Sequence, residues 1–544
     1  ELAGRARPPA LPAAEPDVPL FAIAVVLLLG VVIWGAVNAG SLNAVGASAL
    51  GWVLTNCGWV FVVAADFFLV LALVLAASRY GKVRLGRDDD TPEFTTLAWM
   101  AMMFAAGMGI GLMFYGVAEP LTHYFKPPPG IGVQTGTADA ARTAMEYTLF
   151  HWTLHPWAIY AITGLALAYS TFRKGRGNQF SAAFEPLFGR RKGIGRVLDL
   201  LAILATVFGT ATSLGLGALQ VEYGLNELFD FSGRRAEVII IIVLTLCFVI
   251  SAATGVHGGV QWLSTVNVYL ALVLALVIFV FGPTVAILDL VPASIGGYLS
   301  DLVAMSTRTG AFTSKEWLGT WTIFYWAWWL SWAPFVGAFI ARISRGRTIR
   351  EFIVGVMLVP SAVSVIWFCV SGGSALTMQR AGTADFAPAI AKGSEAALFA
   401  LLNNLPLAAV TTVVAVVLIA LYFVSGADSA SLVLGSLSTR GSLHPPRTLV
   451  IVWGVLIGAV AVVLLISGGL TGLQQATIII ALPFVVVMML MCVALVKELR
   501  VDPGAGPLPV RGHPYGLWVA IKRVVGDEDA PSSELPRDRP SWPA

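Results

Sequence analysis

Charged residues are scarce in this chain, and their scarcity excludes an ordinary soluble globular protein. Only 12% of the 544 residues are Asp, Glu, Lys or Arg, whereas 57% are hydrophobic and the mean hydropathy is +0.81. Cysteine is also rare. The four cysteines are scattered through apolar stretches at positions 57, 247, 369 and 492, so they indicate neither a disulfide framework nor a metal site.

Long apolar runs take up most of the chain. Alternating polarity of the kind found in membrane barrels is absent, so these runs predict an all-α polytopic membrane protein. Twelve stretches of about 20 apolar residues are long enough to cross a bilayer. They lie near 20–40, 53–78, 95–115, 143–170, 197–225, 236–255, 265–287, 320–342, 350–372, 398–425 (continuing to about 436), 448–468 and 475–497.

Three regions follow from this division. Residues 1–18 are rich in Pro and Ala and are expected to be a disordered tail rather than a cleaved signal. Residues 19–500 form the helical membrane domain. Residues 501–544 form a second tail, with one short helix expected at Tyr515–Val525. Within the membrane domain, the segment before residue 320 is expected to hold an amphipathic surface helix near Ile295–Met305.

The distribution of basic residues predicts the orientation of the spans. With a cytoplasmic N-terminus, the inner loops and tails hold 26 of the 34 Lys and Arg residues and the outer loops hold the other eight. The positive-inside rule therefore places both termini in the cytoplasm. The net charge of +3 is accounted for by this asymmetry and indicates no nucleic-acid partner.

Aromatic residues crowd the segment from Trp321 to Phe335, WTIFYWAWWLSWAPF. At 100° per residue, six of its aromatic side chains share an arc of about 140°, while Trp326 points elsewhere. A continuous wall of indoles, away from water, suits a cation that cannot donate hydrogen bonds, such as a quaternary ammonium. The alternative is lipid-facing or packing tryptophan, although an interfacial belt would place tryptophans at the helix ends.

Three alternating glycines interrupt the third span. Gly107, Gly109 and Gly111 weaken the helix where the bilayer is deepest. An unwound stretch there frees backbone groups that can hold an ion or a carboxylate, which a membrane tolerates only beside a cavity. Close helix packing through small residues is the alternative.

The fourth and fifth spans carry a second aromatic face and a set of hydroxyls. HWTLHPWAIY, residues 151–160, presents Trp152, Trp157 and Tyr160, and Pro156 is expected to kink the helix. His151 and His155 are interpreted as polar packing groups because no third metal ligand is evident. Thr206 and Thr210 lie one turn apart on the fifth span, where hydroxyls either bond back to their own helix or coordinate sodium.

Two acids lie within apolar spans. Asp66 is interpreted as an internal hydrogen-bonding group, with a functional carboxylate as the alternative. Asp428 follows Ser425 and Gly426 in a polar interruption of the tenth span, and this interruption favours a functional role. The alternative is that Asp428 reaches the cytoplasmic end of the helix and is solvated.

The chain resembles the betaine/choline/carnitine transporters over nearly all of residues 20–500. The resemblance rests on GMGIGLMFYGVAEPLTHY, HWTLHPWAIYA and WTIFYWAWWLSWAPFVGAFIARISRGRTIREF. It implies twelve transmembrane helices, usually in a homotrimer, with two peripheral helices followed by two inverted five-helix repeats of the LeuT type, spans 3–7 and 8–12. It also implies a multi-pass protein of the bacterial plasma membrane with no enzymatic activity and no cofactor other than a coupling ion.

The resemblance further implies the binding residues. A trimethylammonium group would sit among Trp152, Trp157, Tyr160 and Trp329, with Trp328 and Trp332 along the path, and a carboxylate would meet the backbone of Gly107, Met108, Gly109 and Gly111. One sodium site would carry over to Ala105, Met108, Tyr422 and Ser425. The second would carry over to Thr206, Thr210 and Phe335.

Two departures from the family bear on coupling and regulation. Gly426 stands where sodium-coupled members commonly have serine, so one ligand must come from a carbonyl, water or a neighbouring group. Proton-coupled choline carriers of the family often have an acid where this chain has Gly111. Sodium-independent exchangers place an Arg near the ion site, and this chain has no basic residue in the corresponding part of a span. The tail also lacks the strongly basic helix of osmosensing members, so it offers little attraction to anionic lipid.

These features predict sodium symport of glycine betaine or a related compatible solute, serving osmoprotection. The alternatives are a proton-coupled or exchange-type carrier of choline, carnitine, ectoine, proline or a dimethylsulfonium compound. From other classes, the alternatives are a non-transporting amine sensor, which would need a signalling domain, and an ion channel, which would leave the aromatic residues unexplained.

Overall fold

The computed structural model describes residues 15–107, 109–254 and 257–506, and in this part of the chain all regular elements are helices, with one isolated bridge between Arg84 and Thr348. Eight of its helices are long and apolar enough to cross a membrane, and a bent pair makes a ninth. The predicted all-α polytopic membrane class is therefore confirmed. The predicted helix at Tyr515–Val525 and nearly all of both tails lie outside the described residues.

The helices have the following bounds. The first group is α1 Val18–Val37, α2 Ala39–Asn56, α3 Gly58–Ala77, α4 Thr96–Gly107, α5 Ile110–Phe125, α6 Ala138–Trp152, α7 Leu154–Ala168, α8 Glu185–Phe188, α9 Lys192–Phe229 and α10 Arg234–Thr254. The second group is α11 His257–Phe281, α12 Thr284–Ser306, α13 Lys315–Thr320, α14 Thr322–Arg342, α15 Ile349–Ala381, α16 Ala387–Lys392, α17 Ala397–Asn403, α18 Ala408–Ser438 and α19 Arg447–Leu499.

Two predicted spans are each divided into two helices. The third is broken between α4 and α5, whose axes differ by 65°, which confirms the break expected at the glycines. The fourth is divided at Thr153, between α6 and α7. Pro156 explains this division, since it lacks the amide hydrogen that would bond one turn back, near the carboxyl end of α6.

The predicted eleventh and twelfth spans correspond to the two parts of α19, which are separated at Gly469, where φ is positive at 58°. Other boundaries differ from the sequence-based ones. The helix α2 was not predicted, and α12 extends well beyond the expected segment Ile295–Met305. Packing also continues past residue 500, because Asp502 is buried.

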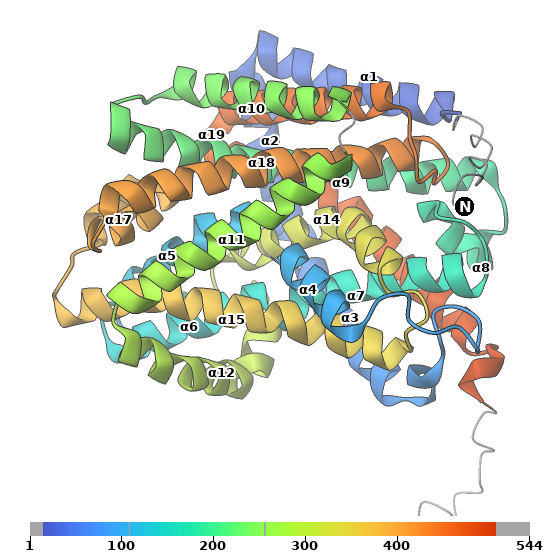
Figure 1. Ribbon diagram of the computed structural model, residues 1–544, viewed down its shortest axis with the longest axis horizontal. Helices are drawn as coiled ribbons and strands as arrows, with labels where there is room; N and C mark the ends of the chain where they lie inside the picture. Colours follow the sequence, from blue (N-terminus) through green and yellow to red (C-terminus); the bar gives the residue numbers. More distant parts are fainter. Residues whose placement is uncertain (1–14, 108, 255–256, 507–544) are drawn as a thin grey trace, which may run out of the picture.

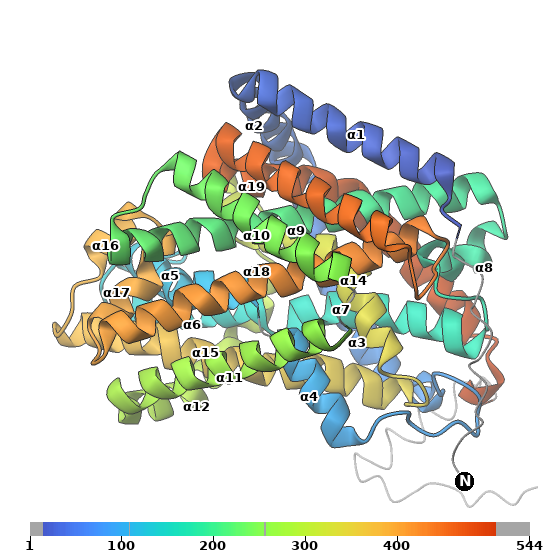
Figure 2. The same ribbon diagram turned by 45° about the horizontal axis from the view of Figure 1, so that its top comes forward.

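The long helix α9 lies at the centre of the bundle (Figure 1). It packs against α19, α18, α14 and α5. The helices α1 and α12 lie at opposite edges of the bundle in both views (Figures 1 and 2). Many of their large apolar side chains are exposed, among them Val26, Ile33, Leu288 and Val303, as expected of helix faces that meet lipid.

An ion pair between Arg173 and Asp502 joins the segment that follows α7 to the segment that follows α19. Asp502 accepts hydrogen bonds from the guanidinium of Arg173, with Nη2 to Oδ1 at 2.8 Å, and from the Tyr169 hydroxyl at 2.6 Å. Burial opposes ionisation of Asp502, but these hydrogen bonds outweigh it and lower the pKa of its carboxyl below the ordinary value. The exposed Asp88 is a second partner of Arg173.

Candidate functional site

A cavity of about 290 Å³ lies in the middle of the bundle beside the break between α4 and α5. Apolar and aromatic walls with a few polar groups are typical of small-molecule sites. Its lining comes from α4, α5, α6, α7, α9, α11, α14, α15 and α18 and includes Gly107, Gly111, Trp152, Trp157, Tyr160, Ser213, Asn267, Trp328, Trp329, Trp332, Ser425 and Gly426.

The four aromatic residues predicted to form a cage meet in this cavity. Trp152 ends α6, Trp157 and Tyr160 lie on α7, and Trp329 lies on α14. Their rings meet edge to face, at centroid distances of 5.0 Å for Trp152 and Trp329, 5.3 Å for Trp157 and Tyr160, and 6.0 Å for Tyr160 and Trp329. The structure thus brings together ring faces that can attract a cation.

Hydrogen bonds fix two indoles of α14. Trp328 Nε1 donates to Ser213 Oγ at 3.1 Å, and Trp329 Nε1 donates to the carbonyl oxygen of His151 at 3.0 Å. Trp332 also lines the cavity. Trp326 is fully buried and stacks on His155 at 5.2 Å, so it is a packing residue and does not face lipid.

The two ends of α14 differ in exposure. Phe324 and Tyr325, in its first turn, are fully buried, and Tyr115 packs against both. The cavity continues along the other half of the helix to the half-buried Phe335 and to Phe339, which is 38% exposed. The cavity is therefore lined by the carboxyl-terminal half of α14, whereas the first turn of this helix is packed among aromatic side chains.

The backbone at the glycine break lines the cavity, as the sequence predicts. Gly109 is extended, with φ −175°, and a Cβ there would have no neighbour within 4 Å among the described residues. Gly111 is different, because a Cβ would lie 2.7 Å from the Cη2 atoms of both Trp152 and Trp328. Only glycine leaves room for both indoles at this position. Met108, predicted to contribute to two sites, lies outside the described residues.

The first predicted sodium site is partly assembled. Ala105, Tyr422 and Ser425 line the same cavity. Asn267, which the sequence did not single out, donates from Nδ2 to Ser425 Oγ at 3.1 Å. The buried Oδ1 of Asn267 has no hydrogen-bond partner in the described part of the chain, and the position of Gly426 beside Ser425 is open.

The second predicted sodium site is spread more widely. Thr210 and Phe335 line the cavity. Thr206 is buried one turn away on α9, where its hydroxyl donates to the carbonyl of Ala202 at 2.8 Å. Of the two alternatives for this hydroxyl, the structure shows the bond back to its own helix.

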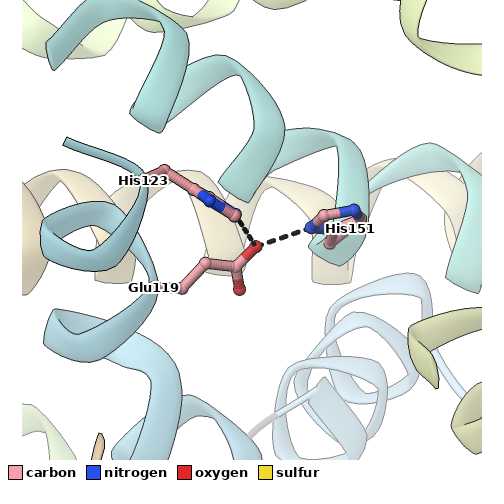
Figure 3. Close-up of side chains that lie close together, drawn as sticks. All are labelled: Glu119, His123 and His151. Atoms are coloured by element: carbon pink, nitrogen blue, oxygen red, sulfur yellow. Dashed lines mark hydrogen bonds and ion pairs between the residues drawn. The ribbon is translucent and has the colours of Figure 1, made fainter. Parts of the chain in front are cut away.

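A buried cluster that the sequence did not predict lies behind the cage. Glu119 Oε1 is 2.6 Å from His151 Nδ1 and 3.5 Å from His123 Nε2 (Figure 3). These three residues offer ligand atoms that all lie within 4.8 Å of one another, which is close enough to be considered for a metal ion. The sequence did not indicate that Glu119 and His123 reach His151 from α5, but the buried, hydrogen-bonded ring of His151 agrees with its interpretation as a polar packing group.

The two acids that the sequence singled out within the spans, Asp66 and Asp428, have internal partners. His155 Nε2 lies 3.0 Å from Asp66 Oδ1, which confirms Asp66 as an internal hydrogen-bonding group. Asp428 is 3% exposed and accepts a hydrogen bond from Ser251 at 3.0 Å. The alternative of a solvated Asp428 is therefore wrong.

An all-helical membrane fold with a broken helix beside an aromatic cavity defines the class of protein as a membrane transporter. A sequence profile of the betaine/carnitine/choline family transporters matches residues 19–504. The chain belongs to this family. It is accordingly a multi-pass membrane transporter and not an enzyme.

Several bacterial relatives are similar over most of their length. The glycine betaine transporter OpuD of Bacillus subtilis (strain 168) is 44% identical over 486 residues, covering 88% of this chain and 94% of that protein. The betaine/ectoine transporter LcoP of Corynebacterium glutamicum is 41% identical, covering 90% and 79%. An ectoine/hydroxyectoine transporter of Virgibacillus pantothenticus is 40% identical, covering 88% and 96%.

Proposed function

We propose that this protein imports glycine betaine, or a closely related trimethylammonium compatible solute, by sodium symport with alternating access. The observation that carries the proposal is the meeting of Trp152, Trp157, Tyr160 and Trp329 in one cavity. Each desolvated contact between a cation and an aromatic face contributes on the order of 2 kcal/mol, so several offset dehydration of a large, weakly hydrated cation. A primary ammonium would leave N–H donors unpaired there.

The glycine break supports the choice of a zwitterion over a simple cation. A trimethylammonium group in the cage leaves the carboxylate of glycine betaine to face the backbone between Gly107 and Gly111. Backbone amides of unwound segments and helix amino ends stabilise carboxylates. The helix α5 begins at Ile110, so its amino end faces the same cavity.

Asn267 supports sodium coupling even though Gly426 provides no hydroxyl ligand. Sodium is bound by oxygen atoms, and the unpartnered Oδ1 of Asn267 is a buried amide oxygen one hydrogen bond away from Ser425. In the proposal, this oxygen replaces the hydroxyl that Gly426 lacks. Tyr422, Ser425 and the backbone of Ala105 and Met108 complete the first site, and Thr206, Thr210 and Phe335 form the second.

The proposal includes the arrangement in the membrane. Both termini lie in the cytoplasm of a bacterial plasma membrane, the twelve spans form inverted LeuT-type repeats, and three copies associate. With that orientation the carboxyl end of α14 faces the cytoplasm. The open side of the cavity at Phe335 and Phe339 then corresponds to an inward-facing state, with the outer path closed at Phe324 and Tyr115.

Uptake of radiolabelled glycine betaine into proteoliposomes, with and without an inward sodium gradient, tests this function. We expect accumulation that depends on the gradient. Equal uptake under both conditions would refute sodium coupling, and a proton gradient in its place distinguishes proton symport. A channel would instead show conductance without substrate, and a sensor would bind without uptake.

Ectoine is a second candidate substrate because two of the relatives are named for its transport. Ectoine also carries a delocalised cation and a carboxylate, but it has ring N–H groups that need acceptors. Competition by unlabelled ectoine against labelled glycine betaine ranks the two substrates.

A further inference from the structure

The carboxylate of Glu119 lies directly behind the aromatic cage and is fully buried. Its Oε2 accepts hydrogen bonds from Trp152 Nε1 at 2.8 Å and from the Tyr325 hydroxyl at 2.5 Å. Its Oε1 is the atom that faces His151 Nδ1 at 2.6 Å. Within the described residues no Lys or Arg pairs with Glu119, so this carboxylate is stabilised by aromatic and imidazole groups and not by a salt bridge to a basic side chain.

We propose that Glu119 is a positioning residue for substrate binding, which holds the rings of Trp152 and Tyr325 in place and strengthens the attraction of Trp152 for a cation. This inference rests on the proposed function. An indole N–H can only donate, so the bond to Oε2 fixes the plane of the Trp152 ring. Glu119 itself need not touch the substrate.

The two rings that Glu119 holds flank Trp329. Trp152 meets Trp329 edge to face at 5.0 Å, and Tyr325 lies nearly parallel to it at 6.3 Å with an interplanar angle of 16°. Tyr325 and Trp152 also contact each other, at 5.4 Å. Movement of either ring would therefore displace a neighbour in the cage, because such packing has few voids to absorb it.

The negative charge of the Glu119 carboxylate also strengthens the attraction of Trp152 for a cation. A carboxylate that accepts the indole hydrogen draws positive charge to the N–H edge of Trp152 and leaves its face more negative. Cations are attracted to that face by the ring quadrupole. A buried anion behind the cage adds attraction through a low-dielectric interior, where charges interact more strongly than in water.

A metal ion at the same cluster is the competing interpretation, and the geometry disfavours it. Around tetrahedral zinc, ligands at about 2.0–2.1 Å from the metal lie roughly 3.3 Å apart. Glu119 Oε1 and His151 Nδ1 are 2.6 Å apart, which is a hydrogen-bond distance. A divalent ion would also place positive charge behind a cage suited to cations.

Glu119→Gln tests the proposal, with Glu146→Gln as the matched control. Glu146 is a buried carboxylate on α6, the helix that carries Trp152, but it pairs with the exposed Arg142 at 2.6 Å. A glutamine at position 119 keeps one acceptor oxygen for Trp152 and Tyr325, but it removes the negative charge, so these hydrogen bonds are no longer charge-assisted. We expect the KM for glycine betaine to rise about tenfold, as for loss of one strong hydrogen bond, with the maximal rate changed less than about twofold.

Near-ultraviolet circular dichroism of the substrate-free protein supplies a readout that does not depend on transport. We expect Glu119→Gln to change the aromatic bands and Glu146→Gln to leave them as in the wild type. Tyr325→Phe, which keeps the ring and removes one donor, should show a smaller KM increase than Glu119→Gln. Treatment with EDTA should leave uptake by the wild type unchanged.

Each result that departs from these expectations leads to a separate conclusion about Glu119. A wild-type KM and wild-type aromatic bands in Glu119→Gln would overturn the proposal, as would equal losses in both glutamine variants, which would indicate general destabilisation. Loss of uptake in EDTA with recovery on adding Zn²⁺ would establish the metal site instead. If the wild type takes up no glycine betaine, the proposed function fails, and the spectra still decide whether Glu119 positions the rings.

Discussion

Replacing Gly111 with alanine should weaken substrate binding while the protein still folds and inserts. The added Cβ would lie 2.7 Å from a ring carbon of Trp152 and equally close to one of Trp328. Carbon atoms in contact prefer about 3.5–4.0 Å, so each ring would have to retreat by about 1 Å. Neither ring is free to do so, because Glu119 and Ser213 hold their indole nitrogens.

The size of the effect follows from the cost of overpacking a filled interior, about 1–3 kcal/mol. Applied to substrate binding, this cost corresponds to a KM higher by roughly 5- to 150-fold. The assay is the concentration dependence of glycine betaine uptake in proteoliposomes. Gly109→Ala is the matched control, since its Cβ would meet no described atom within 4 Å and its φ suits any residue. An unchanged KM in Gly111→Ala, or equal losses in both variants, would refute the reasoning.

Three further predictions follow from the structure. Gly426→Ser adds a hydroxyl at an open position beside the proposed sodium site and should lower the sodium concentration for half-maximal uptake; an unchanged value would contradict that site. Asp502→Asn removes one partner of a buried ion pair and should cost about 3 kcal/mol of stability, measured as a lower thermal midpoint, whereas exposed Asp88→Asn should cost under about 1 kcal/mol. Because the pKa of Asp502 is lowered by folding, its contribution is present above the ordinary Asp pKa and is lost as the pH falls through the folded value, so Asp502→Asn should flatten the acid dependence of the midpoint. Trp329→Ala should abolish uptake without loss of membrane insertion, and retained substrate affinity would refute its place in the cage.

The cage was accessible from the sequence because its members belong to short, dense motifs. Trp152, Trp157 and Tyr160 fall within nine residues, and Trp329 lies in the tryptophan-rich segment, so helical spacing and the family resemblance both identify them. The break at the glycines was equally local, because three glycines within five residues weaken any helix. The structure adds that Gly111 is needed for room and Gly109 is not.

Residues whose role depends on distant partners could not be predicted in this way. Glu119 is a single acid in an apolar helix, and its donors come from residues 32 to 206 positions further along the chain. Asn267 is an isolated amide on α11 that meets Ser425 on α18. The signal available for both was a polar group in an apolar span, which is costly in a membrane and therefore functional by default.

The prediction of helix boundaries from the sequence was limited by a different cause. Hydropathy reports burial in lipid or protein but not where the backbone turns, so the division at Thr153 and the extra helix α2 escaped it. Pro156 carried a signal for the former. The division of α19 at Gly469 was predicted, because it falls between the expected spans 448–468 and 475–497.

Competition for uptake most directly tests the central claim that the aromatic cage selects a methylated cation. Labelled glycine betaine is offered to wild-type proteoliposomes with unlabelled glycine betaine, dimethylglycine or glycine as competitor. We expect strong inhibition by the trimethylated compound, weaker inhibition by the dimethylated one and none by glycine, which keeps its water and would leave N–H donors unpaired in the cage. Equal inhibition by glycine and glycine betaine would show that the cage does not select methylated cations.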